Sequence, residues 1–161
     1  MGLLRLILAL GFAVALSQFP AFSDQYVQRL GGQVDALTQV AGAFDRSADR
    51  AGLTRDQALA ELSGTSFRDA HAGDMRQVFV RLDRARGDLT LLRAASPLER
   101  IALPHRLRDV DTLQATWGDF RPAVPVTGAG FMAAGIGFLL GWALASLLAL
   151  PFRRRESPSW R

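Results

Sequence analysis

The chain has 161 residues, with 19 basic residues that are all arginine, 15 acidic residues and no cysteine. The lack of cysteine excludes a disulfide framework, a thiolate zinc site and a cysteine nucleophile. The surplus positive charge lies near the chain ends, and the central segment has neither a basic face nor interleaved aromatic residues, so we expect no nucleic-acid partner. The length fits two membrane helices around one small domain.

Residues 1–22 are predicted to form either a first transmembrane helix or a signal peptide. Arg5 is the only charge before an apolar run that ends at Leu16. In a signal peptide, the small residues Ala15 and Ser17 would mark the cleavage site. In a retained span, about 20 residues cross the hydrocarbon core and Arg5 stays at the cytoplasmic surface. The apolar character continues past Ser17, so we favour the retained span.

Residues 23–123 are predicted to form a periplasmic helical domain. Ser23 is the expected N-cap of a long helix that stops at Gly52. A second helix of similar length is expected over 67–94, and each carries one narrow apolar stripe with spacings of three and four residues. Such stripes are too narrow to stabilise isolated helices, so we expect an antiparallel hairpin with coiled-coil-like packing. The predicted interface consists of Leu30, Val34, Leu37, Phe44, Met75, Val78, Leu82 and Leu89.

Short accessory helices complete the predicted domain. Thr54 followed by Gln57 is a capping-box pattern for a helix that ends at Leu62. The sequence beginning at Ser96 combines an N-cap serine with proline at the first helical position, and this helix should stop before Pro104. The predicted fold class is therefore an all-α membrane protein, with two transmembrane helices flanking the hairpin and its accessory helices.

A second transmembrane helix is predicted over residues 124–152, followed by a basic tail over 153–161. Small residues occur at every fourth position of this span, a pattern that allows close helix packing. The predicted packing face consists of Ala133, Gly137, Gly141 and Ala145. Its expected partner is, in order of preference, the first span through Ala9 and Ala13, a second copy of the chain, or another membrane protein.

The distribution of arginine predicts the orientation in a bacterial inner membrane. Cytoplasmic flanks of membrane helices are rich in arginine and lysine. The predicted topology determinants are Arg5, Arg153, Arg154 and Arg155. Both termini are therefore expected in the cytoplasm and the central domain in the periplasm.

Several short motifs occur together in the chain. They are Ser17-Gln18-Phe19-Pro20, Tyr26, Arg29-Leu30-Gly31-Gly32, Gly52-Leu53, Ala58-Leu59 and Phe120-Arg121-Pro122-Ala123-Val124-Pro125. As a set they resemble a family of small two-span bacterial inner-membrane proteins known as domain of unknown function twenty-nine thirty-seven. The resemblance implies two spans around a helical domain. It offers no known catalytic or binding residue.

The leading functional hypothesis is a non-enzymatic interaction protein, an accessory subunit or assembly factor of a larger membrane complex, without a cofactor. Its expected partners are the lipid bilayer and another membrane protein or a second copy. One alternative is a carrier or sensor that holds a hydrophobic ligand near Phe44, Met75 and Phe79. Another is a metal-assisted hydrolase using His71 with Asp74 one turn further on, although surface histidines are commonly only solvated. Arginine and aspartate alternate along the helices, which is typical of a solvated face.

Overall fold

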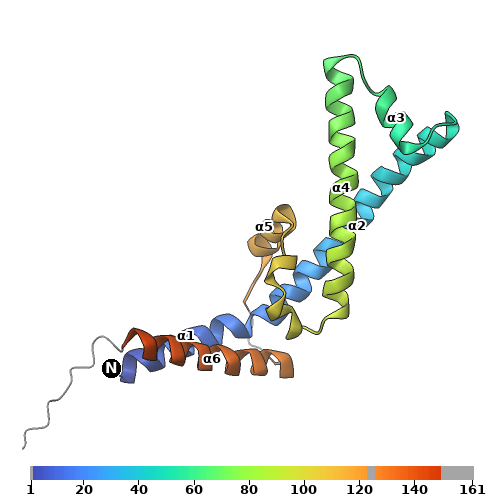
Figure 1. Ribbon diagram of the computed structural model, residues 1–161. Coiled ribbons are helices and arrows are strands. Elements are labelled where there is room, and N and C mark those ends of the chain that lie inside the picture. The colour runs from blue at the N-terminus through green and yellow to red at the C-terminus, as the bar shows by residue number, and fades with distance from the viewer. Residues whose placement is uncertain (1, 123–125, 150–161) are drawn as a thin grey trace, which may run out of the picture. The chain divides into compact units, whose positions relative to one another are not determined.

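The computed structural model describes residues 2–122 and 126–149, and this part of the chain is helical without a strand (Figure 1). The predicted all-α fold is confirmed. The described chain divides into two units, which contain residues 2–23, 97–102 and 120–149, and residues 24–96 and 103–119. We call them the membrane unit and the central unit. Arg153, Arg154 and Arg155, predicted to set the topology, lie outside the described residues.

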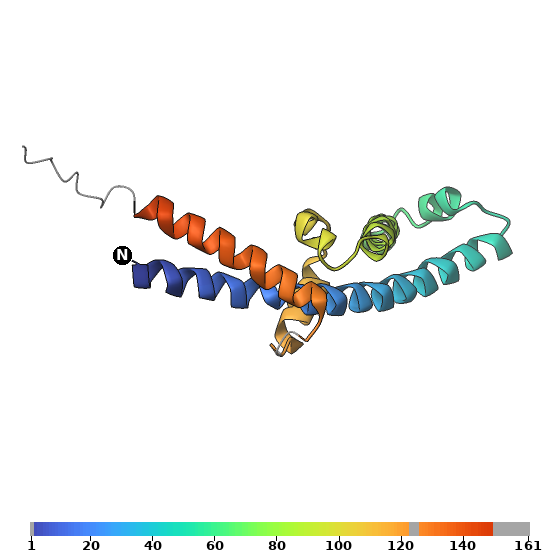
Figure 2. The ribbon, with the colours of Figure 1, turned by 90° about the horizontal axis from the view of Figure 1, so that it is seen from below.

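The membrane unit is built around α1 (Gly2–Ser17) and α6 (Gly128–Leu148). The two helices lie side by side and run in opposite directions, as both views show (Figures 1 and 2). Thr127 caps α6, because its Oγ1 accepts the Gly130 N–H at 3.1 Å. By length and composition, α6 and the helical stretch Gly2–Arg50, of which α1 is the first part, are long and apolar enough to cross a membrane, as predicted.

The next helix, α2 (Phe19–Arg50), begins after a turn at Gln18 and runs from the membrane unit into the central unit. The prediction of an N-cap at Ser23 is wrong. Ser23 lies inside α2, fully buried, and its Oγ donates to the Pro20 carbonyl at 2.9 Å. A serine can bond to a carbonyl of the preceding turn as well as cap a helix, and Pro20 is tolerated because it falls in the first turn.

The predicted end of α2 at Gly52 is confirmed. Gly52 has φ +72°, a left-handed conformation that favours glycine. Its N–H bonds to the Asp49 carbonyl at 3.0 Å, and the Leu53 N–H bonds to the Ala48 carbonyl at 2.9 Å. These two bonds form a Schellman motif, which satisfies carbonyls that the helix end would otherwise leave unpaired.

The short helix α3 (Arg55–Glu61) has the predicted capping box: Thr54 Oγ1 accepts the Gln57 N–H, and Gln57 Oε1 accepts the Thr54 N–H at 2.9 Å. The long helix α4 (Ser66–Ala94) follows. Its N-cap is Thr65, whose side chain accepts the Arg68 N–H at 3.3 Å. The helix thus begins one residue earlier than expected.

Helices α2 and α4 run in opposite directions and cross obliquely (Figures 1 and 2). Side-chain contacts join the two helices at three places. Because the helices are antiparallel, residues early in α2 contact residues late in α4. The Arg93 guanidinium lies over Gly31, Arg86 donates to Thr38 Oγ1 at 2.9 Å, and the rings of Phe44 and Phe79 meet edge to face at 5.6 Å. Long arginine and phenylalanine side chains keep the two backbones apart, so close backbone approaches are few.

The chain after α4 contains less regular helix than predicted. The start at Ser96 leads only to the 3-10 helix η1 (Glu99–Ala102), and a second one, η2 (Pro104–Arg106), follows at once. Proline at the first position of η2 prevents the first turn from continuing as one helix. The last helix of the central unit is α5 (Val110–Asp119).

Candidate functional site

The small-residue face of α6 lies against α1. Gly137 and Gly141 are buried, and a Cβ built on Gly141 would lie 2.8 Å from the Ala9 Cα and 2.9 Å from the Leu8 carbonyl oxygen. A Cβ on Gly137 would lie 2.9 Å from the Leu16 Cβ. No real Cβ tolerates such contacts. The two helices therefore approach closely only because glycine occupies both positions.

The other predicted packing residues lie on the same interface. Ala9 and Ala133 are fully buried, Ala145 is 4% exposed and Ala13 is half-buried. The opposite faces of the two helices carry bulky apolar side chains that are exposed, including Ile7, Leu10, Phe131, Leu139 and Trp142. This division is typical of a helix pair that packs through small residues and presents large ones to lipid.

Arg5 lies in the first turn of α1, half-buried. Its Nε is buried and has no hydrogen-bond partner among the described residues. An arginine this close to a helix end typically reaches toward the membrane surface with its charged head.

In the central unit, a buried carboxylate holds the segment after η2 against α4. Asp88 is 3% exposed. Arg108 donates to it from Nε at 2.7 Å and from Nη2 at 3.2 Å, and Arg106 donates from Nη1 at 3.2 Å. A buried carboxylate is tolerated when charged hydrogen bonds replace its water. Asp88 is therefore an anchor for this segment.

A second ion-pair cluster lies about two turns earlier on α4. Arg81 donates to both carboxylate oxygens of Asp109 at 3.0 Å and to Asp111 at 2.7 Å. Asp109 also accepts the Thr112 N–H at 3.0 Å, so it caps the start of α5. Burial acts to raise the pKa of Asp109, but the hydrogen bonds from Arg81 and Thr112 outweigh it and hold this pKa below its usual value. The bond to Asp109 raises the pKa of Arg81.

Helix α2 meets the same cluster from the other side. Tyr26 is fully buried, and its hydroxyl accepts the Asp109 N–H at 3.2 Å. Burial raises the pKa of Tyr26, which keeps the phenol neutral. Gln33 contacts the Thr112 hydroxyl and lies within hydrogen-bonding distance of both Arg81 and Asp109. Three parts of the central unit, α2, α4 and the start of α5, thus converge on Asp109.

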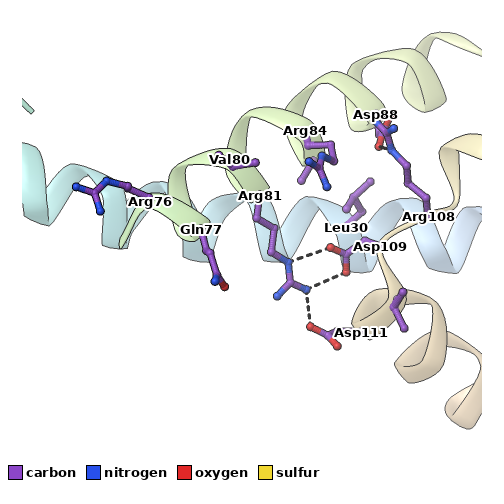
Figure 3. Close-up of a pocket in the computed structure, with 12 residues that line it drawn as sticks. Leu30, Arg76, Gln77, Val80, Arg81, Arg84, Asp88, Arg108, Asp109 and Asp111 are labelled. Atoms are coloured by element: carbon purple, nitrogen blue, oxygen red, sulfur yellow. Dashed lines mark hydrogen bonds and ion pairs between the residues drawn. The ribbon is translucent and has the colours of Figure 1, made fainter. Parts of the chain in front are cut away.

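Beside these ion pairs lies a cleft of about 500 Å³ (Figure 3). One wall is a face of α4 with Arg76, Val80 and Arg84, and the other is the segment 108–111. Leu30 of α2 also lines it. Val80 and Val110 are more than half exposed at the cleft. Arg76 and Arg84 are exposed and have no hydrogen-bond or ion-pair partner among the described residues.

A family model described as a protein of unknown function (DUF2937) matches residues 1–157. The chain belongs to this family. The family predicted from the short motifs is thereby confirmed. No curated protein and no solved structure matches the chain. The description of the family names no activity for the DUF2937 chain.

The residues expected at the hairpin interface differ in burial. Five are buried and three, Leu37, Phe44 and Val78, are half-buried. The buried ones are Leu30, Val34, Met75, Leu82 and Leu89. None of the eight residues predicted for the hairpin interface is therefore fully exposed.

The residues expected to hold a hydrophobic ligand differ in their surroundings. Phe44 borders a second cavity of about 400 Å³ near α3, whereas Met75 and Phe79 are buried and line neither this cavity nor the cleft beside the ion pairs. The Arg55 guanidinium covers the Phe79 ring at 4.0 Å and pairs with Asp45 at 2.7 Å. These aromatic residues therefore pack within the domain.

His71 lies on the exposed side of α4, and its ring stacks on that of Phe67 with the centroids 6.3 Å apart. No cluster of three or more histidine, aspartate or glutamate side chains suited to a metal occurs within residues 2–122 and 126–149. His71 and Asp74 are therefore not part of a group of three such side chains among the described residues.

The interpretation of alternating arginine and aspartate as a solvated face is wrong for the segment 106–111. Arg106, Arg108 and Asp109 pair with side chains of α4, and Asp88 is buried. The useful signal in the sequence was an aspartate in the apolar stripe of α4, directly before Leu89. A charge at a buried helical position requires a partner of opposite sign.

Proposed function

We propose that this chain is a non-enzymatic bacterial inner-membrane protein that anchors a helical interaction domain, as an accessory subunit or assembly factor of a larger membrane complex. One observation carries the proposal: the α6 face with Gly137 and Gly141 is occupied by α1 of the same chain. The membrane surface that remains is bulky and apolar, which suits lipid. Recognition of a protein partner therefore falls to the central unit.

The antiparallel pairing of α1 and α6 supports a topology with both termini on one side. The start of α1 and the end of α6 lie together (Figures 1 and 2). Arg5 and the arginines after α6 then assign this side to the cytoplasm and the central domain to the periplasm. Retention of the N-terminal span is also favoured, because cleavage after Ser17 would remove α1 and uncover the two glycines.

The topology is tested with single cysteines, which the cysteine-free chain allows without further changes. In intact cells with a permeabilised outer membrane, a membrane-impermeant maleimide should label Phe67→Cys, a position 79% exposed in the central unit. It should label Ser157→Cys only after the inner membrane is opened. Intact mass should show residues 1–17 still present. A mature chain that starts at Gln18 would overturn the two-span topology. So would labelling of Ser157→Cys in intact cells, with Phe67→Cys labelled only after the inner membrane is opened.

The interaction role is tested by capture in native membranes. A photo-crosslinking residue at Val40 or Leu91, both exposed apolar positions of the central unit, should give one discrete adduct after irradiation. The tagged partner should in turn capture this chain. The purified chain alone provides the control and should give no such adduct. Recovery of the isolated monomer from every position would rule out the interaction role.

A further inference from the structure

We propose that the cleft between α4 and the segment 108–111 binds an anionic amphiphile, a ligand with a carboxylate or phosphate head and a short apolar chain (Figure 3). This site adds a small ligand to the proposed interaction role. It differs in place and chemistry from Phe44, Met75 and Phe79, the residues expected from the sequence to hold a hydrophobic ligand.

The charges around the cleft are partly paired with one another. All three carboxylates that line it already accept from arginine: Asp88 from Arg106 and Arg108, and Asp109 and Asp111 from Arg81. Their negative charge is compensated.

Two cationic side chains of the cleft are not compensated in this way. Arg76 and Arg84 line it and have no ion-pair partner among the described residues. The charge left over at the cleft is therefore positive, and guanidinium groups form strong hydrogen bonds to carboxylate and phosphate.

The spacing of these arginines adds an apolar element. Arg76, Val80 and Arg84 are four residues apart, so they lie along one face of α4, about 12 Å from end to end. Figure 3 shows Arg76 at one end of the cleft and Arg84 near its middle. Val80 lies between them and is 54% exposed. The arginines can bind the anionic head group of an amphiphile, and the exposed valine beside them can contact its hydrocarbon chain.

The rest of the lining favours an amphiphile over a free inorganic anion. Val110 contributes apolar surface and is 61% exposed, and the buried side chains of Leu30 and Ala85 also line the cleft. A small-molecule site is typically mostly apolar, with a few polar groups that orient the ligand, and has a volume of about 300–1,000 Å³. The cleft, at about 500 Å³, lies in this range. Phosphate alone would leave the apolar wall uncovered.

The test uses the full chain in nanodiscs of neutral lipid, with titration calorimetry corrected for empty nanodiscs. The probes are octanoate, octyl phosphate, octylammonium and inorganic phosphate. We expect saturable binding of octanoate or octyl phosphate, and the stronger of the two identifies the head group. Octylammonium should not bind, and inorganic phosphate should bind at least about tenfold more weakly. Equal binding of octylammonium or of inorganic phosphate, or no binding of either anionic probe, would refute the site.

Variants separate a specific site from partition into the bilayer. Arg76→Gln with Arg84→Gln should weaken binding by at least about tenfold, because charged hydrogen bonds are lost. Arg68→Gln is the matched control: it removes an arginine from the same helix but outside this cleft, and should bind as the parent does. Val80→Trp keeps every charge and should also weaken binding by filling the mouth.

None of the substituted side chains makes a hydrogen bond to another described residue, so helicity by circular dichroism should stay unchanged. Unaltered affinity in the double arginine variant would contradict the proposal. The measurement needs no protein partner, so its failure is distinguishable from a failure of partner capture.

Discussion

Replacing Gly137 and Gly141 together by leucine is expected to separate α1 from α6 while both helices stay inserted. At each position even a Cβ would lie under 3 Å from atoms of α1, including backbone atoms. The helices must then move from close contact toward the 8–10 Å axial distance usual for larger interface residues. Overpacking of this kind costs roughly 1–3 kcal/mol per site. The added leucines leave the span apolar, so insertion is not impaired.

The separation is measured as the distance between spin labels on Leu3→Cys and Leu147→Cys in the full chain. Both positions are more than 60% exposed, so the labels do not enter the interface. Leu3 is at the start of α1 and Leu147 at the end of α6, and these two helix ends lie together (Figure 2). The parent chain should give one narrow distance distribution, and the double variant a longer and broader one.

Gly135→Leu is the matched control for this experiment. Gly135 is on the same helix but exposed, and a Cβ there would meet nothing within 4 Å. Its distribution should equal that of the parent chain. An unchanged distribution in the Gly137 and Gly141 variant would mean that the close contact is not maintained in the membrane.

The face of α6 was predictable from sequence because its determinants are local. A small residue at every fourth position defines a stripe on any straight helix, and in a membrane such stripes allow close approach. The stop at Gly52 and the capping box at Thr54 were predictable for the same reason: each depends on a few adjacent residues and on backbone geometry.

The start of α2 was not predictable from a local rule. Ser23 has the chemistry of an N-cap, but a hydroxyl inside a helix bonds equally well to a carbonyl of the preceding turn, as it does to Pro20. Ser23 is an N-cap only if the helix begins there, and an interior residue if the apolar residues before it are already helical. The hydrophobic pattern around Ser23 fits both cases.

The ion-pair clusters around the cleft were missed because they join segments far apart in the chain. Arg81 pairs with Asp109 and Asp88 with Arg108, across 28 and 20 residues. Alternating charge is the usual signature of a solvated helix, and nothing in the local sequence showed that η2 and α5 would fold back onto α4. Only that docking turns Asp88 from a surface charge into a buried one.

Asp88→Ala is expected to release the segment 106–111 from α4. The substitution removes the carboxylate that receives three hydrogen bonds from Arg106 and Arg108. Breaking a buried ion pair typically costs about 3–5 kcal/mol. Both guanidinium groups are one third to one half exposed and regain water, so we expect a lower cost of about 2–3 kcal/mol.

The release is measured by hydrogen exchange of the α5 amides in the full chain. A loss of about 2–3 kcal/mol raises exchange through local opening by roughly 30- to 150-fold. Asp111→Ala is the matched control, because Asp111 belongs to the neighbouring cluster but its side chain is 74% exposed. An exposed pair contributes at most about 1 kcal/mol, so exchange should rise by about fivefold or less.

The two variants distinguish burial from ion pairing as the source of the stability. If Asp88→Ala and Asp111→Ala accelerated exchange equally, the buried position of Asp88 would have no special role. Asp88→Asn keeps the shape and one acceptor oxygen but removes the charge, so it should fall between the parent and Asp88→Ala. That order follows from the physics of a desolvated carboxylate, whose charge is stabilised only by its two arginines and is what holds them in place.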